Sequence, residues 1–403
     1  MPHSSHLSRR GFLSLAAGAA ALPAQQKKPS VGAVITEFRH MSHADVICTR
    51  LFDGYYPNGV FQAPRTRVVS MYLDQVPFND QAVALAQRYG YSMQSTIAGA
   101  LERGKDALDV DAVLLIGEHG DYPENELGQK MYPRHRLLSG IVDVFRKSGR
   151  SVPVFSDKHL SYDWDKAKEM YDWSRELGFP FAAGSSIPVT VRTPELEIPY
   201  GAKIRRAVQT GYGGIDAYGF HTLESLQCMV ERREGGETGV AAVEMLEGDA
   251  VWRWRDGPGA WSKPLLEAAA GRSPNTKPGK PEDNCKQPVL FLVTYRDGLE
   301  AAAYLLNGHL SSWDFACEID GKTVSTHFGP VPDHRQLTHF DGLTHVIEEL
   351  FVTGKPLYPI ERTLTTTGTL AFLFQSRGKK RRVETPELKI EYKAPRNCFF
   401  QRA

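Results

Sequence analysis

A lysine stands where an apolar run gives way to polar residues near the middle of the chain. Residues 152–156 read VPVFS, and Asp157, Lys158 and His159 follow directly. A lysine at the end of a strand can polarise a substrate hydroxyl or carbonyl and, when its pKa is lowered, act as a base. We therefore predict that Lys158 is catalytic. The alternative interpretation is a surface ion pair with Asp157.

A second polar group follows another apolar run, because residues 118–121 read EHGD after the run at 112–117. The carboxyl ends of neighbouring parallel strands meet at the edge where α/β proteins bind ligands. His119, Asp157 and His159 could form a metal site or an acid–base cluster there, or a polar rim held by hydrogen bonds. We favour the rim, predict no metal, and expect Asp157 and His159 to contact substrate.

His221, at the start of a helical pattern over residues 221–233, is a third candidate. A neutral imidazole can take a proton from a substrate hydroxyl, so we predict a catalytic role. A capping or packed histidine is the alternative. Aromatic residues near these motifs would suit stacking on a sugar ring or could pack the core: Tyr122, Tyr162, Trp164, Tyr212 and Tyr218. Of these we assign Tyr122 and Tyr218 to the substrate.

A parallel sheet is needed to bring these side chains together. Short β-rich runs alternate with helical patterns in the first half of the chain, which is typical of βαβ units. Strands are predicted at residues 31–38, 68–74, 112–117, 152–156 and 181–184, and helices at 80–89, 135–147 and 164–177. Because the strands are apolar almost throughout, helices must cover both faces of their sheet.

The pattern changes after about residue 186. A helix at 221–233 precedes strand-like runs at 239–247, 289–295, 300–306 and 313–319, which indicates a second domain with a mostly antiparallel sheet. The stretch 256–287, rich in Gly, Pro and Lys, predicts an exposed loop. Helices are predicted at 340–351 and 362–376 and a last short strand at 388–392, with a solvated basic turn at 377–382.

The composition is that of an ordinary globular protein. The chain has 403 residues, of which 41% are hydrophobic and 24% charged, which excludes a disordered or fibrous protein. A formal net charge of +1 gives no reason to expect nucleic acid as a partner. The five cysteines are scattered, so one disulfide is possible but a disulfide scaffold or a structural zinc site is not expected.

The N-terminus has the pattern of an export signal. Residues 8–13 read SRRGFL and lead into a short run of small and apolar residues that ends at Pro23. A paired arginine ahead of such a run predicts a twin-arginine signal cleaved near Ala24, although an alanine-rich first helix would read similarly. No later apolar run approaches the roughly 20 residues of a membrane span, so we expect a soluble mature protein outside the cytoplasm.

Four segments carry a resemblance that covers nearly the whole mature chain. They read DVDAVLLI at residues 109–116, SVPVFSDK at 151–158, GGIDAYGFHTLE at 213–224 and YPIE at 358–361. In this order they resemble the Gfo/Idh/MocA family, the glucose–fructose oxidoreductase and inositol dehydrogenase type of NAD(P)-dependent enzymes. The family's catalytic Asp, counted back from the histidine, falls on Ala217, and the neighbouring Asp216 is taken as its counterpart.

The resemblance implies a fold, a division into domains and an activity. The expected fold is a Rossmann-like, doubly wound parallel sheet domain at residues 29–185, then an α+β domain with a mostly antiparallel sheet at 186–403, after a signal and linker at 1–28. The implied activity is NAD(P)-dependent hydride transfer on a carbohydrate or polyol by a homo-oligomer. Lys158 would orient the substrate and His221, with Asp216, would move the proton.

The expected cofactor loop departs from the family pattern. A dinucleotide-binding turn uses glycines so that the backbone can approach the pyrophosphate at a helix N-terminus. Here residues 36–43 read TEFRHMSH, no glycine occurs between positions 32 and 54, and Glu37 would place a carboxylate near the phosphates. We therefore expect weak dinucleotide binding. The predicted contacts are Thr36, Arg39, Ser42, Asp74, Glu118 and His119, with Asp74 on the ribose.

The departures leave two other functions open on the same scaffold. One is a non-redox hydrolase or lyase that uses His119, Asp157 and His159. The other is a carbohydrate-binding protein without catalysis. Retained dinucleotide would separate the redox function from both, and glycoside cleavage or metal dependence would separate the two from each other.

Overall fold

The first sheet brings the carboxyl ends of its parallel strands to one edge of the sheet. A computed structural model describes residues 27–329 and 337–402. Six parallel strands lie in the order β3-β2-β1-β4-β5-β6. They are β1 (Ser30–Ile35), β2 (Arg67–Leu73), β3 (Ser92–Gln94), β4 (Ala112–Ile116), β5 (Val154–Asp157) and β6 (Phe181–Gly184). The order reverses between β1 and β4, and a crevice is expected beyond their carboxyl ends.

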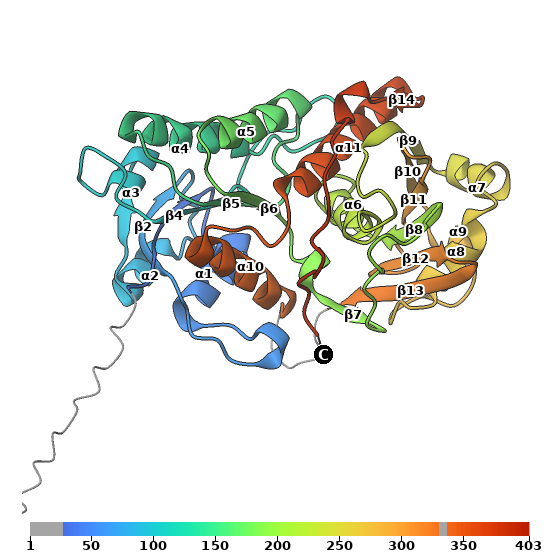
Figure 1. Cartoon of the computed structure of the whole chain (residues 1–403), viewed down its shortest axis with the longest axis horizontal. Helices are drawn as coiled ribbons and strands as arrows, with labels where there is room; N and C mark the ends of the chain where they lie inside the picture. Colours follow the sequence, from blue (N-terminus) through green and yellow to red (C-terminus); the bar gives the residue numbers. More distant parts are fainter. Residues whose placement is uncertain (1–26, 330–336, 403) are drawn as a thin grey trace, which may run out of the picture.

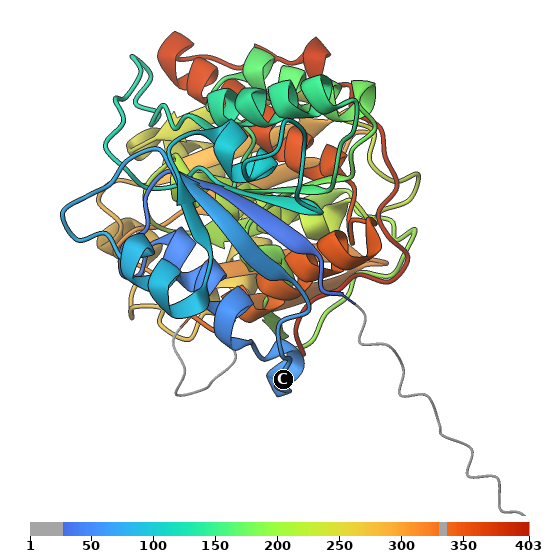
Figure 2. The same ribbon diagram turned by 90° about the vertical axis from the view of Figure 1, so that its left-hand side faces the viewer.

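Helices cover both faces of this sheet (Figures 1 and 2). Side chains alternate between faces along each strand, so Val34 joins one core while Ile35 joins the other. One face is covered by α3 (Ile97–Glu102), α4 (Arg134–Ser148) and α5 (Trp164–Glu176), and the other by α1 (His43–Asp53), α2 (Ala82–Tyr89) and α10 (His339–Thr353). Helix α10 comes from the C-terminal part of the chain, so that part also builds the first sheet's core.

The second sheet has eight strands in the order β14-β9-β10-β11-β8-β12-β13-β7, and only the β8–β11 pair is parallel. The strands are β7 (Val191–Thr193), β8 (Arg206–Gly211), β9 (Val240–Glu247), β10 (Val289–Tyr295), β11 (Glu300–Leu305), β12 (Trp313–Ile319), β13 (Lys322–Gly329) and β14 (Val383–Glu384). Helices α6 (Ala217–Val230) and α11 (Ile360–Lys379) pack on the face toward the first domain. The expected fold class is confirmed.

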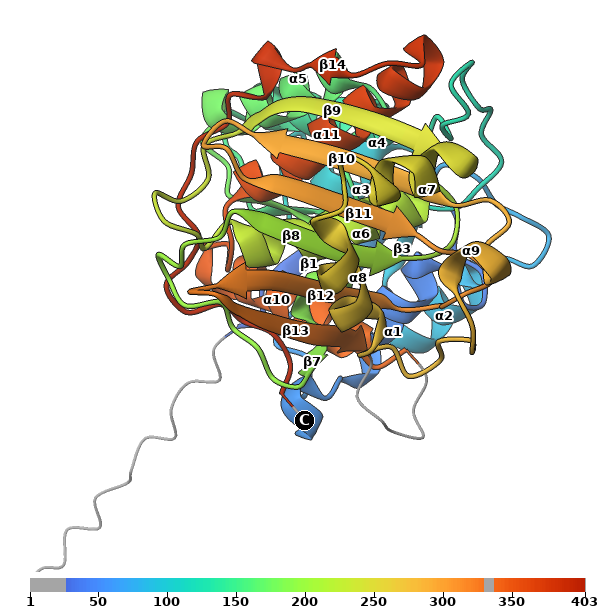
Figure 3. The ribbon, with the colours of Figure 1, turned by 90° about the vertical axis from the view of Figure 1, so that its right-hand side faces the viewer.

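The expectation of an exposed loop at residues 256–287 is wrong. The stretch contains α8 (Ser262–Ala270) and α9 (Pro281–Asn284), and follows α7 (Asp249–Asp256). Leu265, Leu266 and Ala269 of α8 are buried against the outer face of the second sheet (Figure 3). The Gly, Pro and Lys residues that predicted a loop lie around these apolar positions, and packing overrides the local composition.

The predicted last strand at 388–392 is also wrong. The short strand lies earlier, at β14, and a 3₁₀ turn at Pro386–Leu388 follows it, with Tyr392 forming only an isolated bridge to Glu237. The basic segment at 377–382 is largely exposed, as expected, but only residues 380–382 lie in a turn, because 377–379 end helix α11 (Ile360–Lys379). None of the five cysteines forms a disulfide. Within the described residues, no helix combines the length and apolar character that crossing a membrane requires.

Candidate functional site

Lys158 stands at a sharp bend directly after β5. Its φ is 70°, in the left-handed region that non-glycine residues rarely adopt, and its N–H donates to the Gly184 carbonyl. This bend carries the side chain over the carboxyl edge of the sheet. The Lys158 side chain is almost fully buried, with Nζ 2.6 Å from His221 Nε2 and 3.9 Å from a Glu118 carboxylate oxygen. Residues 158 and 221 are therefore brought together, as the sequence predicts.

Burial and the contact with Lys158 together disfavour protonation of His221. His221 lies in the first turns of α6, where burial, and then the charge of Lys158, lower its pKa well below the ordinary value. A neutral imidazole accepts at Nε2 the hydrogen bond that the lysine ammonium donates. Its Nδ1 is buried without a hydrogen-bond partner among the described residues. The pair thus joins a cationic donor to an imidazole that can take up a proton.

Glu118 is held as a carboxylate behind this pair. Burial alone would raise its pKa, but the charges of Lys158 and Arg134 hold it down to about 2. Arg134 is fully buried, forms an ion pair with Glu118 and lies 3.2 Å from His159 Nε2. His159 therefore faces Arg134, and the structure separates it from Asp157, which binds His43 instead. No cluster of three or more potential metal ligands occurs in the described ranges.

A cleft of about 340 Å³ opens above Lys158 and His221. Its polar lining includes Glu118, His43, His119 and His339, and its aromatic lining includes Tyr212, Tyr218 and Trp313. Tyr218 and Trp313 stack at 5.8 Å between ring centroids with 20° between their planes. A wall of aromatic faces beside hydrogen-bonding groups suits a ring that carries several hydroxyls.

Two further histidines of the cleft, His119 and His339, also have lowered pKa values. Burial, and then the proximity of His43, lowers the pKa of His119 to about 4. Burial, and then the charge of Arg50, lowers the pKa of His339 to about 3. Both imidazoles are therefore expected to be uncharged at neutral pH.

Comparisons with known proteins agree on the fold. No protein-family model matches the chain, and no curated protein matches its sequence. Among solved structures, GenD2 from gentamicin A biosynthesis, in complex with NAD, is 13% identical, with 94% of this chain and 99% of that chain covered and a TM-score of 0.55. The scyllo-inositol dehydrogenase of Lactobacillus casei, with bound NAD(H) and scyllo-inositol, is 11% identical, with 89% and 99% covered and a TM-score of 0.54.

A third match is the myo-inositol 2-dehydrogenase of Lactobacillus plantarum, 11% identical, with 89% of this chain and 99% of that chain covered and a TM-score of 0.53. This chain shares its fold with these three structures. In that fold the crevice at the β1–β4 reversal is the place where a dinucleotide is expected. The residues of this crevice can therefore be tested for their fit to one.

The turn between β1 and α1 does not offer an open phosphate cradle. The Ser42 hydroxyl caps α1 and accepts from Asp45 N, while the Asp45 carboxylate accepts from Met41 N. Both groups occupy backbone donors that a pyrophosphate would need. Glu37 is buried in the same turn, with its carboxylate 2.5 Å from Arg39 Nε. The predicted anion contacts of Arg39 and Ser42 are thus already taken up within the chain.

Asp74, the acid expected to bind the ribose, is likewise already hydrogen-bonded within the chain. Asp74 accepts hydrogen bonds from the hydroxyls of Tyr72 and Tyr122 and from Arg136. Although burial raises its pKa, these three donors lower it overall, so the carboxylate is fully used by protein groups. Thr36 donates its hydroxyl to the Glu118 carbonyl, 2.6 Å away. The turn and Asp74 do not fit a tightly held dinucleotide.

Four other predicted residues do not line the cleft, and one of them is Asp157, predicted to contact substrate but fully buried against His43. Tyr122, assigned to the substrate from sequence, instead binds Asp74 because the segment after β4 folds back over the end of β2. Asp216 stands before α6, where its carboxylate accepts from Lys130 N, and burial raises its pKa to about 6. His159 packs on Phe220 beside Arg134. Glu118, His119, Lys158, Tyr218 and His221 do line the cleft.

Sequence reasoning missed four polar or aromatic residues of the cleft: His43, Ser186, Trp313 and His339. His43 and His339 are the first residues of α1 and α10, and Trp313 begins β12. The helix α1 itself was not predicted, although Ser42 is a preferred N-cap residue and apolar positions follow at helical spacing. That signal could have found His43.

Proposed function

We propose that the cleft is the active site of an enzyme that transforms a carbohydrate or polyol, with oxidoreductase chemistry as the first candidate. The observation that carries this proposal is the 2.6 Å contact between Lys158 Nζ and His221 Nε2 below the Tyr218–Trp313 wall. A substrate hydroxyl in the cleft would accept a hydrogen bond from Lys158. When Lys158 turns its hydrogen bond from His221 Nε2 to that oxygen, the Nε2 lone pair would become free to take the hydroxyl proton.

The oxidoreductase candidate draws support from the fold. Structures of the same fold were solved with NAD or NAD(H), one of them with scyllo-inositol as well. A dinucleotide used by this chain would have to be an exchangeable co-substrate, because the capped α1 and the engaged Asp74 leave few groups to hold it. Polyols and sugars related to inositol are the substrate class that fits the aromatic wall.

A second candidate is a non-redox lyase or hydrolase that works with the cleft residues alone. The specific observation in its favour is that Ser42, Asp45 and Glu37 fill the turn where the fold would place a pyrophosphate. A carbohydrate-binding protein is the remaining alternative. In that case, the cleft would bind a sugar without converting it.

We expect the purified protein, produced without residues 1–26, to carry little nicotinamide dinucleotide. The capped turn should let NAD(P) dissociate during purification and dialysis, which absorbance and mass spectrometry of the denatured protein would measure. The same sample is then tested for reduction of added NAD⁺ or NADP⁺ at 340 nm with inositols and hexoses. Such reduction supports the oxidoreductase. Conversion of a sugar without dinucleotide supports the second candidate, and binding without conversion supports the third.

Stoichiometric NAD(P) that survives dialysis would contradict the weak-binding prediction. It would at the same time strengthen the oxidoreductase candidate. A second variant, Glu37→Gln, removes the buried carboxylate of the turn. It is expected to bind NADH more tightly than the wild type, because one negative charge near the phosphates is lost.

Export is proposed on the N-terminal sequence, which lies outside the described residues. Fused to a folded reporter, residues 1–26 should direct it out of the cytoplasm. Arg9→Lys combined with Arg10→Lys should retain it, because the paired arginines are the recognised feature. Cell fractionation measures the outcome, and unchanged export of the double variant would refute the twin-arginine route.

A further inference from the structure

His43 and Asp157 form a histidine–carboxylate pair that the proposed transfer between Lys158 and His221 does not use. His43 is the first residue of α1 and Asp157 is the last residue of β5. His43 Nδ1 lies 2.6 Å from an Asp157 carboxylate oxygen. Asp157 is fully buried, whereas the His43 side chain is 16% exposed and lines the cleft. The carboxylate is therefore behind the imidazole as seen from the cleft.

This contact determines which nitrogen of His43 is basic. A carboxylate only accepts, so Nδ1 carries the shared proton and Nε2 keeps its lone pair. Asp157 also stabilises the imidazolium that forms when Nε2 takes a proton. No described residue is hydrogen-bonded to His43 Nε2. The nitrogen is left available to a molecule in the cleft.

Among the described histidines that line the cleft, His43 alone is hydrogen-bonded to a carboxylate. His221 binds Lys158, and His119 lies 3.5 Å from an Arg39 nitrogen. Burial lowers the pKa of His119, His221 and His339, whose protonated forms have no directly bonded carboxylate. His43 is the cleft imidazole whose protonated form would have a directly bonded carboxylate.

The pair also bridges the crevice of the first sheet. Strand β4 lies between β1, which leads into α1, and β5, which ends at Asp157. The contact between His43 and Asp157 therefore passes over the end of β4, with the His119 ring 5.2 Å from the His43 ring. The histidines occupy the reversal point of the sheet, where α/β proteins bind their ligands.

We infer that His43, oriented by Asp157, is a second catalytic base of the cleft. The inference rests on the proposed function in that the cleft is taken as the active site. His43 Nε2 removes the proton from a different hydroxyl of the substrate than the one that Lys158 binds, and the electron pair of that O–H bond stays on its oxygen. The imidazolium, partly exposed, returns its proton to product or water.

Two substitutions test the pair against a matched control. His43→Gln removes the base, and Asp157→Asn lets the amide donate to Nδ1, which drives the proton onto Nε2. Each is expected to lower turnover of the sugar or polyol found by the assay above about 100-fold. The control is His327→Gln, because His327 pairs with Asp314 at 2.7 Å with the same 16% and 0% exposed fractions, away from the cleft lining. It is expected to retain turnover within twofold.

A second readout does not depend on the substrate. Diethyl pyrocarbonate modifies unprotonated imidazole nitrogens, and mass spectrometry of peptides locates each modified histidine. His43 should react in the folded wild type and at least tenfold more slowly in Asp157→Asn. Unreactive His43, or His43→Gln with wild-type turnover, would overturn the inference. A wild type that converts no sugar would instead refute the proposed function, and the reactivity of His43 would then decide the inference alone.

Discussion

Replacing Lys158 with methionine is expected to lower turnover by about 10³-fold while the free energy of unfolding falls by about 1–3 kcal/mol, the cost of leaving His221 Nε2 buried without a partner. Lys158 Nζ is the charged donor nearest His221 in the cleft, so the variant loses both the hydrogen bond to the substrate oxygen and the partner that orients the imidazole. Methionine retains the length of the buried stem. Glu118 keeps its ion pair with Arg134, so no carboxylate is left uncompensated.

The experiment compares kcat, KM and urea denaturation of the variant with those of the wild type. Lys166→Met is the matched control, because Lys166 is a first-domain lysine that binds the Tyr162 hydroxyl and does not line the cleft. It should leave turnover unchanged. A Lys158→Met protein that unfolds would show that the lysine is structural. Full turnover in a folded variant would end its catalytic assignment.

The sequence could predict the first sheet and the central pair of the site for a physical reason. Strands buried on both faces must be apolar throughout, so β4 and β5 are visible as runs, and the polar residues after them mark the strand ends. Lys158 and His221 are far apart in the chain. They meet because Lys158 directly follows β5 and His221 lies in the first turns of α6. Their roles as catalytic residues stay predictions.

Residues whose position depends on backbone turns could not be placed in this way. The bend at Lys158 and a second at His119, both with φ of 70°, decide which side chains enter the cleft. They send Lys158 and His119 inward, while His159 turns to the buried Arg134. Tyr122 follows a chain segment that crosses to Asp74. Sequence spacing gives the strand end but not the direction of the chain beyond it.

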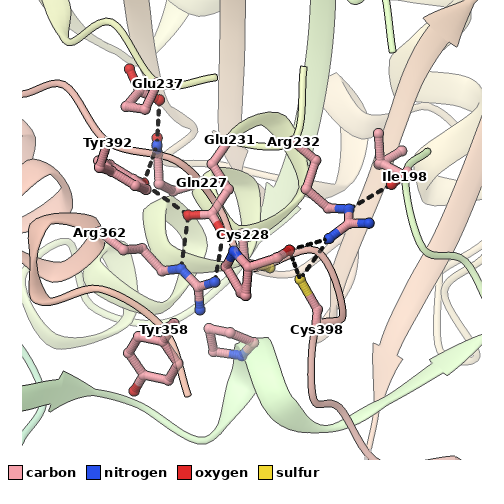
Figure 4. Close-up of polar contacts among 12 residues, drawn as sticks. Ile198, Gln227, Cys228, Glu231, Arg232, Glu237, Tyr358, Arg362, Tyr392 and Cys398 are labelled. Atoms are coloured by element: carbon pink, nitrogen blue, oxygen red, sulfur yellow. Dashed lines mark hydrogen bonds and ion pairs between the residues drawn. The ribbon is translucent and has the colours of Figure 1, made fainter. Parts of the chain in front are cut away.

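A buried ion pair at the far end of α6 should dominate the stability of the second domain. Glu231, directly after α6, accepts hydrogen bonds from Arg362 of α11 and from the Tyr392 hydroxyl (Figure 4). Gln227 extends this network to Glu237. Burial lowers the pKa of Arg362, but the adjoining Glu231 raises it well above its ordinary value, so the guanidinium stays charged. The pair ties α6, and with it His221, to α11.

Glu231→Gln is therefore expected to lower the free energy of unfolding by about 3–5 kcal/mol, because it preserves the side-chain shape but leaves Arg362 buried without a countercharge. Glu231→Leu with Arg362→Met should cost less than the single change, since no unpaired charge remains. The exposed pair of Arg206 and Glu300 supplies the control: Glu300→Gln should change stability by less than about 1 kcal/mol. Urea denaturation measures all three. A Glu231→Gln protein within 1 kcal/mol of the wild type would mean that neighbouring groups or water solvate Arg362, and that packing rather than charge holds α6 in place.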